Sequence, residues 1–453
     1  MKALWTWPEL CEALELPVTD GPAVTGISID SRRTRPGDLF FALSGDPGPR
    51  FNPSQRSDRD GHDFIDAAVA NGAAGVVAHD GRERPCPQLQ VTDTLDALWA
   101  LGAAGRRRLQ GPAIAVTGSS GKTTVKGFLA AALRAFSAPG SLNNHLGVPW
   151  SLALTPRTAR AGVYEIGTNH TGEIAPLSRL VRPDVAVVLN VHPAHRQNFA
   201  SMAALTDEKL SIHEGLRRGG HLVLEESLPT DRVRPGLRVT RFGHAADALV
   251  RLLEIEDRQA TFRVGARTVT AHVPGGGAHR AMSLAAVLCV LEVLGHDLAP
   301  ALALDDALIG PGRGREHEVG GITIIDDSYN ANPESMKAAL VGLQARKERH
   351  RYALLGEMLE LGDAGPGFHR ALAEHTAGLT GVFCVGEGMR PLFTALPAAV
   401  RLHFSAEADE ALTGTLAATL QRGDVLLVKG SNRVFWARDY VGRLTQELSE
   451  KSS

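Results

Sequence analysis

The feature that most constrains the fold is a glycine loop between a strand pattern and a helix pattern. Residues 113–117, AIAVT, form a short apolar run that is typical of a buried strand, and the loop 118–121 follows it directly. Apolar residues then recur at helical spacing from Val125 to Phe136. A strand, a glycine loop and a helix in this order predict the phosphate-binding loop of a parallel α/β sheet.

The side chains of this loop suit a nucleoside triphosphate such as ATP. Backbone amides in a glycine turn can face a phosphate chain, Lys122 can reach the outer phosphates, and Thr123 can hold Mg²⁺. The spacing departs from the common pattern because Val116, not glycine, stands five residues before Gly121. The alternative interpretation is a structural glycine turn with a surface lysine. The predicted nucleotide contacts of the loop are Gly118, Ser119, Ser120, Gly121, Lys122, Thr123 and Thr124.

Length and strand spacing predict three α/β domains. The chain has 453 residues, enough for about three domains. Residues 1–110 alternate strand and helix patterns, 111–311 contain the glycine loop with further strand patterns at 163–167 and 185–191, and 312–453 form a Rossmann-like domain. The central domain is expected to be a parallel sheet covered by helices. The strand patterns of the last domain are 322–326, 352–356, 382–386 and 425–430.

Charge and hydropathy exclude several classes of function. With 48 basic and 50 acidic residues the net charge is −2, so no overall field attracts nucleic acid or an anionic membrane. No uncharged apolar run reaches the ~20 residues that a membrane-spanning helix needs. We therefore expect no nucleic-acid partner, no membrane insertion and a cytoplasmic location. The triple arginine at 106–108 is interpreted as an exposed linker or helix end rather than a nucleic-acid patch. The four cysteines lie far apart and predict free buried thiols.

Polar residues follow several of the predicted strands. Glu165 ends the 163–167 run, where a carboxylate beside the phosphate loop could ligate Mg²⁺ or pair with an arginine. His195 follows the next strand pattern, a position that a loop histidine without function could also occupy. The cluster DDSYNANP at 326–333 could contact a base or ribose, and it could equally be a turn without function. Pro333 is expected to begin the next helix.

Motifs in all three predicted domains, taken together and in order, resemble the Mur ligases. In the first domain, SIDSRRTRPGDLFFAL and DGHDFIDAAVANGAAGVV resemble the family's nucleotide-sugar domain. The others are TGSSGKTT, YEIGTNHTGEI, the stretch from His195 to Lys209, PGR at 311–313, DDSYNANPESM and LVKGS at 427–431. The resemblance implies a three-domain, ATP-dependent amide ligase of peptidoglycan precursor synthesis. DDSYNANP most resembles the member that joins D-alanyl-D-alanine to UDP-N-acetylmuramoyl-tripeptide through an acyl phosphate.

The resemblance also implies roles for individual residues. Lys122, Glu165, His195 and Lys209 would be catalytic, with Thr123 and Glu165 at one Mg²⁺ and His195 and a carbamylated Lys209 at a second. Without the resemblance, Lys209 would be interpreted as an exposed helix lysine. ATP contacts are implied for Arg313, Asp327 and Asn330. Contacts with the UDP-muramoyl peptide and the amino substrate are implied for Ser31, Arg32, Ser44, Gly45, Asn143, Asn144, Thr168, Asn169, His170, Lys429 and Ser431.

Three departures from the family pattern bear on the acceptor. Arg196 and Gln197 follow His195 where the family has an acidic residue, Ser283 replaces an asparagine, and residues 45–56 lengthen a loop near the implied uridine site. Two alternatives therefore stay open: a paralogue that acts on another carboxylate and amine, and an ATP-binding homologue without turnover. The expected partners are small-molecule substrates, and a monomer is expected.

Overall fold

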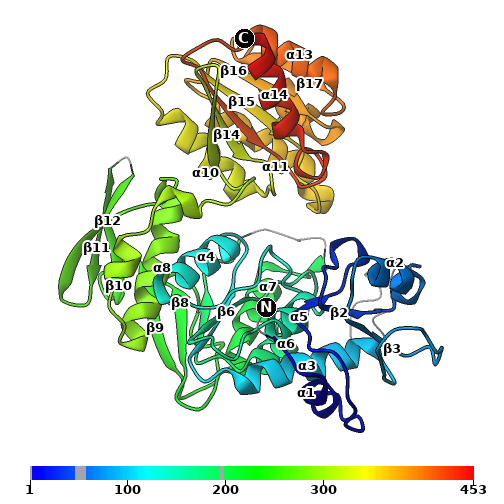
Figure 1. Cartoon of the computed structure of the whole chain (residues 1–453). Helices are drawn as coiled ribbons and strands as arrows, with labels where there is room; N and C mark the ends of the chain where they lie inside the picture. Colours follow the sequence, from blue (N-terminus) through cyan, green and yellow to red (C-terminus); the bar gives the residue numbers. More distant parts are fainter. Residues whose placement is uncertain (1–2, 46–57, 193–197, 257, 453) are drawn as a thin grey trace.

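The computed structural model describes residues 3–45, 58–192, 198–256 and 258–452 (Figure 1). These residues form three β-sheets, one in each successive part of the chain, with helices packed on their faces. The C-terminal sheet and its helices form a lobe above the central sheet in Figure 1, and the N-terminal sheet lies to one side. The observed class is the predicted α/β class. No helix within the described ranges is long and apolar enough to cross a membrane.

The first sheet is small and wholly parallel, in the order β1-β2-β3-β4. Trp7 and Leu10 of α1 pack in the core on one face, and Ile65 and Ala68 of α2 pack on the other. The bounds are α1 (Trp7–Ala13), β1 (Gly26–Ser28), β2 (Asp38–Phe41), α2 (Ile65–Ala70), β3 (Gly75–Ala78) and β4 (Gln88–Gln90).

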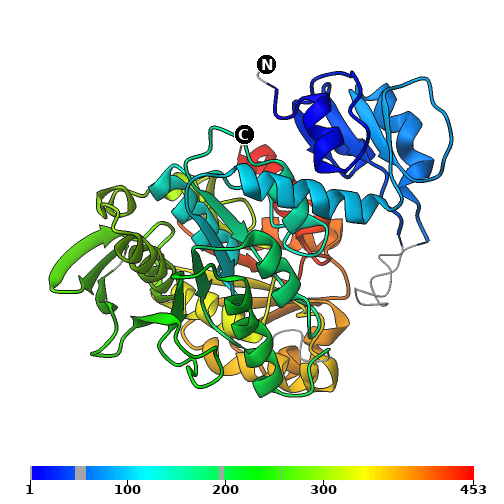
Figure 2. The same cartoon turned by 90° about the horizontal axis from the view of Figure 1, so that it is seen from below.

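Helix α3 (Thr94–Arg108) joins the first sheet to the central one, as Figure 2 shows. Two glycines on it allow a very close approach to α5 (Gly147–Ala153), because a Cβ at Gly105 would lie 2.1 Å from the Leu152 carbonyl oxygen. The prediction that 106–108 form a helix end is right, but the prediction of exposure is wrong for Arg106, which is 6% exposed. Its guanidinium is drawn inward by three backbone carbonyls.

The central sheet has eight strands in the order β12-β11-β10-β9-β8-β7-β5-β6. Phe128 of α4 and Leu284 of α8 pack on one face, and Leu152 of α5 and Leu177 of α6 on the other. The bounds of the strands are β5 (Ala113–Thr117), β6 (Gly162–Glu165), β7 (Val185–Val188), β8 (His221–Glu225), β9 (Arg238–Gly243), β10 (Val250–Glu256), β11 (Gln259–Val264) and β12 (Arg267–His272). The bounds of the remaining helices are α4 (Lys122–Leu133), α6 (Ile174–Val181), α7 (Met202–Leu210), α8 (Ala278–Leu294) and α9 (Ala299–Leu302).

The central sheet is parallel, as expected, except at one edge that the sequence patterns do not predict. The strands from β6 to β10 run parallel, whereas β11 pairs with both β10 and β12 in the antiparallel sense. A short turn at residues 265–266 joins β11 to β12, and the outer residues of β10 and β12 are partly exposed, which antiparallel strands tolerate.

The C-terminal sheet has six strands in the order β13-β14-β18-β15-β16-β17. All four predicted strands are present, and Pro333 begins α10 as expected. The sequence patterns missed β13, an antiparallel edge strand with the charged sequence REHEV, and β17 at the other edge. The bounds are β13 (Arg315–Val319), β14 (Ile322–Asp327), α10 (Pro333–Gln344), β15 (Arg351–Gly356), α11 (Gly365–Ala371), β16 (Gly381–Val385), α12 (Arg390–Ala395), β17 (Arg401–Ser405), α13 (Glu410–Thr419), β18 (Val425–Lys429) and α14 (Tyr440–Ser452).

Candidate active site

The predicted phosphate loop lies between the carboxyl end of β5 and the amino end of α4. Gly121 adopts φ 81°, a backbone conformation that favours glycine, so α4 can begin at Lys122 without strain. Asn190, just after β7, fixes the loop: its carbonyl accepts from the Ser119 amide at 3.1 Å and its side-chain oxygen accepts from the Ser120 amide at 3.0 Å. The loop is therefore held from the neighbouring strand and does not rely on its own sequence alone.

Two side chains that flank this loop, those of Thr117 and Lys122, are not paired with an acidic group among the described residues. Thr117 Oγ1 is buried and has no hydrogen-bond partner within the described residues. The Lys122 ammonium is turned back to the Gly118 carbonyl oxygen at 2.8 Å. Burial, above all, lowers the pKa of Lys122. An entering anion would supply both groups with a hydrogen-bond acceptor, which fits a phosphate-binding loop.

Glu165 is the centre of a buried oxygen-rich cluster beside the loop. Its side chain accepts from the Thr123 hydroxyl and from the Asn143 amide, each at 2.7 Å. Glu165 is 5% exposed. Its hydrogen bond with Thr123 brings together the two side chains that were predicted to share one Mg²⁺. A hydroxyl and a carboxylate are the hard oxygen ligands that Mg²⁺ prefers, and Mg²⁺ usually takes its other ligands from phosphates and water. In keeping with that, no group of three or more acidic, histidine or cysteine side chains that could hold a metal occurs among the described residues.

Lys126 is a member of this cluster that the sequence analysis missed. It is 8% exposed, its ammonium lies 3.9 Å from Glu165, and it donates to the Ala138 carbonyl oxygen at 3.0 Å. Lys126 follows Thr123 by three residues, which places both on one face of α4. That spacing is the signal that could have identified it.

Lys209 is buried at the end of α7, so the interpretation as an exposed helix lysine is wrong. Burial, and secondly the positive charge of Lys122, lower the pKa of Lys209 to about 7. Its ammonium has no hydrogen-bond or ion-pair partner among the residues described. A buried amine near neutrality beside the phosphate loop is a chemically reactive group rather than a solubilising one.

The second predicted metal ligand, His195, lies outside the described residues, as do Arg196 and Gln197. The same holds for the loop insertion beyond Gly45, up to residue 57. Ser283 is described: it is buried in α8 and donates to the His279 carbonyl oxygen at 3.0 Å.

The loop after β6 carries Thr168, Asn169 and His170 beside Glu165. Glu173 organises it, because one carboxylate oxygen accepts from the Asn169 amide at 2.7 Å and from the His170 amide at 3.1 Å. The next anchor is Glu208, whose carboxylate accepts three backbone amides at the start of α6. Asn169 is exposed on this fixed loop. These hydrogen bonds fix residues 168–170 at the same edge of the central sheet as the phosphate loop.

The neighbouring asparagines 143 and 144 have different surroundings. Asn143 contacts Glu165, as described above. The side-chain oxygen of Asn144 caps α5, accepting from the Leu146 and Gly147 amides at 3.1 and 3.0 Å. Its amide nitrogen has no partner among the described residues, so only that end can contact a ligand.

In the C-terminal lobe three predicted residues meet at the carboxyl ends of β14 and β18. The Lys429 ammonium is 2.7 Å from the Asp327 carboxylate and 3.1 Å from the Asn330 carbonyl oxygen. Ser431 points elsewhere: its hydroxyl accepts from the Leu359 amide at 2.9 Å and ties β18 to the loop after β15.

The central and C-terminal lobes touch at the linker 310–314. The Tyr329 hydroxyl hydrogen-bonds the Ser141 hydroxyl across the junction, and the Arg313 guanidinium lies 4.1 Å from the centre of the Tyr329 ring. Arg280 of α8 donates to the Arg313 carbonyl oxygen at 2.8 Å. Arg313 also acts electrostatically on Lys122, so the two halves of the predicted ATP site face each other.

His279, at the start of α8, is a second residue that the sequence analysis missed. The side chain of His279 keeps part of its surface exposed, and desolvation by the neighbouring residues, then the charge of Arg280, lowers its pKa, which favours the neutral form. The charges of Asp327 and Lys429 act on it as well. A neutral histidine at this junction can accept or donate one hydrogen bond without adding charge.

The residues implied for the uridine end lie at the carboxyl ends of neighbouring parallel strands, β1 and β2. Ser31 is buried, and its carbonyl accepts from the Asn71 side chain at 2.9 Å. Arg32 has 80% of its side chain exposed and pairs with Asp30 at 2.8 Å. Ser44 and Gly45 follow β2, so all four lie on one edge of the first sheet.

Comparison with known proteins agrees with this arrangement. Residues 116–291 match the family model described as the Mur ligase middle domain, and residues 312–432 match the model described as the Mur ligase, glutamate ligase domain. A relative in Escherichia coli, UDP-N-acetylmuramoyl-tripeptide--D-alanyl-D-alanine ligase, is 33% identical over 439 residues and covers 93% of both chains. The enzyme of the same name in Rickettsia prowazekii is 28% identical and covers 95% of this chain and 98% of its own.

Solved structures give the same picture for the fold. A crystal structure of MurF from Acinetobacter baumannii superposes with a TM-score of 0.81 at 28% identity, covering 98% of this chain and 99% of that one. MurF from Thermotoga maritima in complex with ADP gives a TM-score of 0.78 at 28% identity, over 94% and 99% of the two chains. The chain therefore belongs to the Mur ligase family. The predicted three-domain Mur ligase architecture is confirmed.

Proposed function

We propose that this protein joins D-alanyl-D-alanine to UDP-N-acetylmuramoyl-tripeptide at the expense of ATP, in peptidoglycan precursor synthesis. One observation carries the proposal: relatives of that name match nearly the whole chain, at up to 33% identity, so all three sheets and not only the ATP-binding part are shared. Membership of the family supports the predicted class, an ATP-dependent ligase that forms a C–N bond.

The reaction requires activation because a carboxylate is a poor electrophile. An oxygen of the tripeptide carboxylate attacks the γ-phosphorus of ATP, ADP leaves, and an acyl phosphate forms. The amine of the dipeptide then attacks the acyl carbon, loses a proton, and the tetrahedral intermediate expels inorganic phosphate to leave the amide. Two anions must therefore meet at the first step, and cationic groups must offset their repulsion.

The phosphate loop supplies much of that compensation. Its backbone amides and Lys122, released from the Gly118 carbonyl, hold the outer phosphates. Mg²⁺ bound by Thr123 and Glu165 would add positive charge between the phosphates. Arg313, Asp327 and Asn330 would hold ATP from the C-terminal lobe, and Lys429 would keep Asp327 in place. These roles rest on the contacts above and on the family resemblance.

Lys209 is proposed to carry a carbamate. Its uncharged amine adds to CO₂ and releases one proton, which leaves an anionic oxygen ligand for a second Mg²⁺ together with His195. The buried position of Lys209 and its pKa of about 7 support this, because only the uncharged amine can react.

Each part of the chain takes a separate share of the substrates in this proposal. Residues 1–110 bind the UDP end, with Ser31, Arg32, Ser44 and Gly45 at the strand ends of the first sheet. Residues 111–311 bind ATP and the reacting carboxylate. Residues 312–453 close over ATP and receive the amino substrate near Lys429 and Ser431. Asn143, Asn144 and the loop with Thr168, Asn169 and His170 line the cleft between them.

The test is phosphate release by the purified chain with ATP, Mg²⁺ and UDP-N-acetylmuramoyl-tripeptide. Adding D-alanyl-D-alanine is expected to stimulate release at least tenfold over D-alanine or L-alanine alone. Stimulation by a different amine only would identify a paralogue with another acceptor. ATP binding without stimulation by any amine would identify a homologue without turnover, and either result would refute the proposal.

A further inference from the structure

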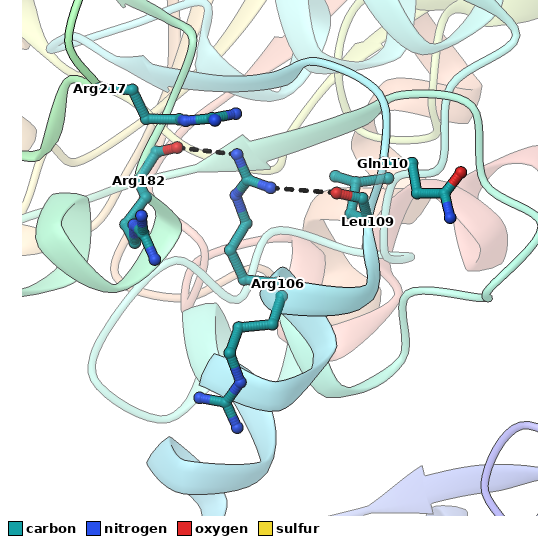
Figure 3. A pocket seen from close by; sticks show the side chains of 6 residues that line it. Arg106, Leu109, Gln110, Arg182 and Arg217 are labelled. Atoms are coloured by element: carbon teal, nitrogen blue, oxygen red, sulfur yellow. Dashed lines mark hydrogen bonds between the residues drawn. The ribbon is translucent and has the colours of Figure 1, made fainter.

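Four arginines from three parts of the chain line a small hollow on the central lobe, and Figure 3 labels three of them. Its volume is about 260 Å³. The hollow is lined by Arg106, Arg107, Leu109, Gln110, Arg182 and Arg217. These residues stand before β5, β7 and β8, at the amino ends of parallel strands, whereas the phosphate loop follows the carboxyl end of β5. The hollow is therefore separate from the candidate active site.

Arg106 has a structural explanation and forms the wall of the hollow. Its guanidinium donates to the carbonyl oxygens of Val181 at 2.6 Å, Arg182 at 2.9 Å and Leu109 at 3.3 Å, two of which Figure 3 draws. It also lies 3.3 Å from the carboxylate of Asp184. These bonds fix the end of α3 to the turn after α6, and they leave Arg106 with little capacity for a ligand.

The other three arginines have no such explanation. Arg107 and Arg182 are exposed, and neither side chain has a hydrogen-bond or ion-pair partner within the described part of the chain. Arg217 pairs with Asp184 at 3.1 Å and keeps 51% of its side chain exposed. The charges of Arg182 and Arg217 both act on Arg106, and the carboxylate of Asp184 is shared between Arg106 and Arg217, so positive charge is in excess around the hollow. Like charges repel, so this convergence costs free energy unless an anion offsets it.

The backbone of Arg182 adds an independent observation. It ends α6 in the left-handed conformation, with φ 47° and ψ 62°, where glycine is the usual residue. A side chain in this conformation is strained, and such positions often serve a function that outweighs the strain. Arg182 lines the hollow in this conformation, and its charge acts on Arg106 together with that of Arg217.

We infer that this hollow binds a small anion with two or more negative charges, of the diphosphate or phosphomonoester class, held by Arg182 and Arg217. Guanidinium groups bind phosphate oxygens through paired hydrogen bonds, which suits this class of ligand. The volume of about 260 Å³ lies just below the ~300 Å³ at which pockets for drug-sized ligands begin, so a phosphate group fits better than a whole nucleotide. The group can belong to a free anion or to a lipid headgroup at a membrane surface.

The experiment measures diphosphate binding by calorimetry to the full chain saturated with ADP, in buffer without Mg²⁺. Saturation with ADP occupies the phosphate loop, so that the remaining binding reports the hollow. One diphosphate per chain is expected, and Arg182→Gly is expected to weaken its binding at least tenfold. Arg217→Gln, which changes no backbone conformation, should weaken it to a similar degree.

Arg134→Gly is the matched control. Arg134 ends α4 in the same left-handed conformation, with φ 49°, is exposed, and does not line the hollow. Both glycine variants should melt at or above the temperature of the parent chain, because glycine relieves the strain at each position. Arg134→Gly should leave diphosphate binding unchanged. Equal loss of binding in both variants, or no effect of Arg182→Gly, would overturn the inference.

A second arm separates the two sources of the phosphate group. Vesicles containing phosphatidic acid are sedimented with the chain, and vesicles of neutral phosphatidylcholine serve as the blank. Binding of free diphosphate alone supports a soluble ligand, and added retention on phosphatidic acid that is lost in Arg182→Gly supports a lipid headgroup. If neither probe binds the parent chain, the hollow is not an anion site.

Discussion

At the scale of single residues, the proposed Mg²⁺ site depends most on Glu165. One carboxylate is held by the Thr123 hydroxyl and the Asn143 amide, with Lys126 close by. The neighbouring groups fix its position before any substrate arrives. Preorganisation of this kind lowers the cost of arranging charge during phosphoryl transfer.

The first prediction concerns this carboxylate. Glu165→Gln retains the shape of the side chain and removes its charge, so the Mg²⁺ concentration for half-maximal activity should rise at least tenfold. Glu225→Gln is the matched control, since Glu225 ends β8 of the same sheet and is not in the cluster. A parallel titration of activity with Mg²⁺ measures the effect. An unchanged Mg²⁺ requirement in Glu165→Gln would remove Glu165 from the metal site.

The second prediction concerns the burial of Lys209. Its pKa is about 7 in the folded chain and about 10.5 when exposed, so the folded state binds fewer protons between these values. Burial of the charged ammonium therefore destabilises the folded state most below about pH 7, and this destabilisation declines as the pH rises toward 10.5. Each unit by which the pKa of Lys209 is lowered corresponds to ~1.4 kcal/mol of folding free energy. Lys209→Met should therefore stabilise the chain by a few kcal/mol at pH 6 to 7. The gap in melting temperature should narrow toward pH 9 in CO₂-free buffer, and a gap that widens would contradict the burial argument.

The third prediction tests the chemical role of Lys209. Lys209→Ala should lose most activity and regain part of it when a small carboxylate such as acetate is added, because the anion can occupy the position of the lost carbamate. Lys337→Ala, an exposed lysine on α10, is the control and should retain full activity with no response to acetate. Full activity in Lys209→Ala would exclude the lysine from the mechanism.

At the scale of elements, the caps and close contacts decide where side chains point. Asn144 begins α5 through two amide hydrogen bonds, and α5 then packs against the two glycines of α3. This contact joins the N-terminal sheet to the central one, so loss of the hydrogen bonds from Asn144 should destabilise the packing of both sheets.

The fourth prediction follows from that cap. Asn144→Ala should lower the free energy of unfolding by about 1 kcal/mol, and Asn144→Asp should restore it, because aspartate also accepts amide hydrogen bonds. Asn143→Ala, next in the chain but not at the cap, provides the comparison for stability. Chemical denaturation measures all three variants, and equal stability of Asn144→Ala and the parent chain would contradict the capping role.

The elements that the sequence predicts well are those with a strong local signal. Buried parallel strands such as β5 and β18 are continuous apolar runs, and Gly121 and Pro333 mark helix starts. β13 was missed because its side chains are charged and only its backbone pairs with β14. The antiparallel edge of the central sheet was missed for a related reason, since the direction of a strand depends on its neighbours and leaves little trace in its own residues.

The candidate site shows the same division. The motif residues Thr123, Glu165, Asp327 and Lys429 could be named from sequence, and their contacts place them in two facing groups. Lys126 and His279 were missed, because the surroundings of each come from residues far along the chain: Lys126 is buried beside Glu165, and the charges of Asp327 and Lys429 act on His279. Burial of a charged side chain is a property of the tertiary structure, and a lysine in an isolated helix pattern looks exposed.

At the scale of the whole molecule, two hydrogen bonds among the described residues cross the junction of the central and C-terminal lobes near the predicted ATP site. The hydroxyl pair of Ser141 and Tyr329 and the bond from Arg280 to the Arg313 carbonyl cross the junction beside Lys122. Contacts of this number permit one lobe to rotate on the other, as expected for an enzyme that must admit large substrates and then exclude water.

The fifth prediction is a measurable closure. The radius of gyration from solution scattering should fall when a non-hydrolysable ATP analogue and UDP-N-acetylmuramoyl-tripeptide are added together. Tyr329→Phe removes the hydroxyl at the junction and should reduce the change, whereas Tyr352→Phe, within the C-terminal lobe, should not. The absence of any compaction in the parent chain would contradict closure.

Oxygen transfer tests whether the tripeptide carboxylate is activated as an acyl phosphate before the amide forms. UDP-N-acetylmuramoyl-tripeptide labelled with ¹⁸O in its terminal carboxylate is converted with ATP and D-alanyl-D-alanine, and both products are examined by mass spectrometry. Each turnover should move one ¹⁸O atom into inorganic phosphate and leave the other in the new amide product. Unlabelled phosphate, or no amide product with D-alanyl-D-alanine, would contradict this mechanism.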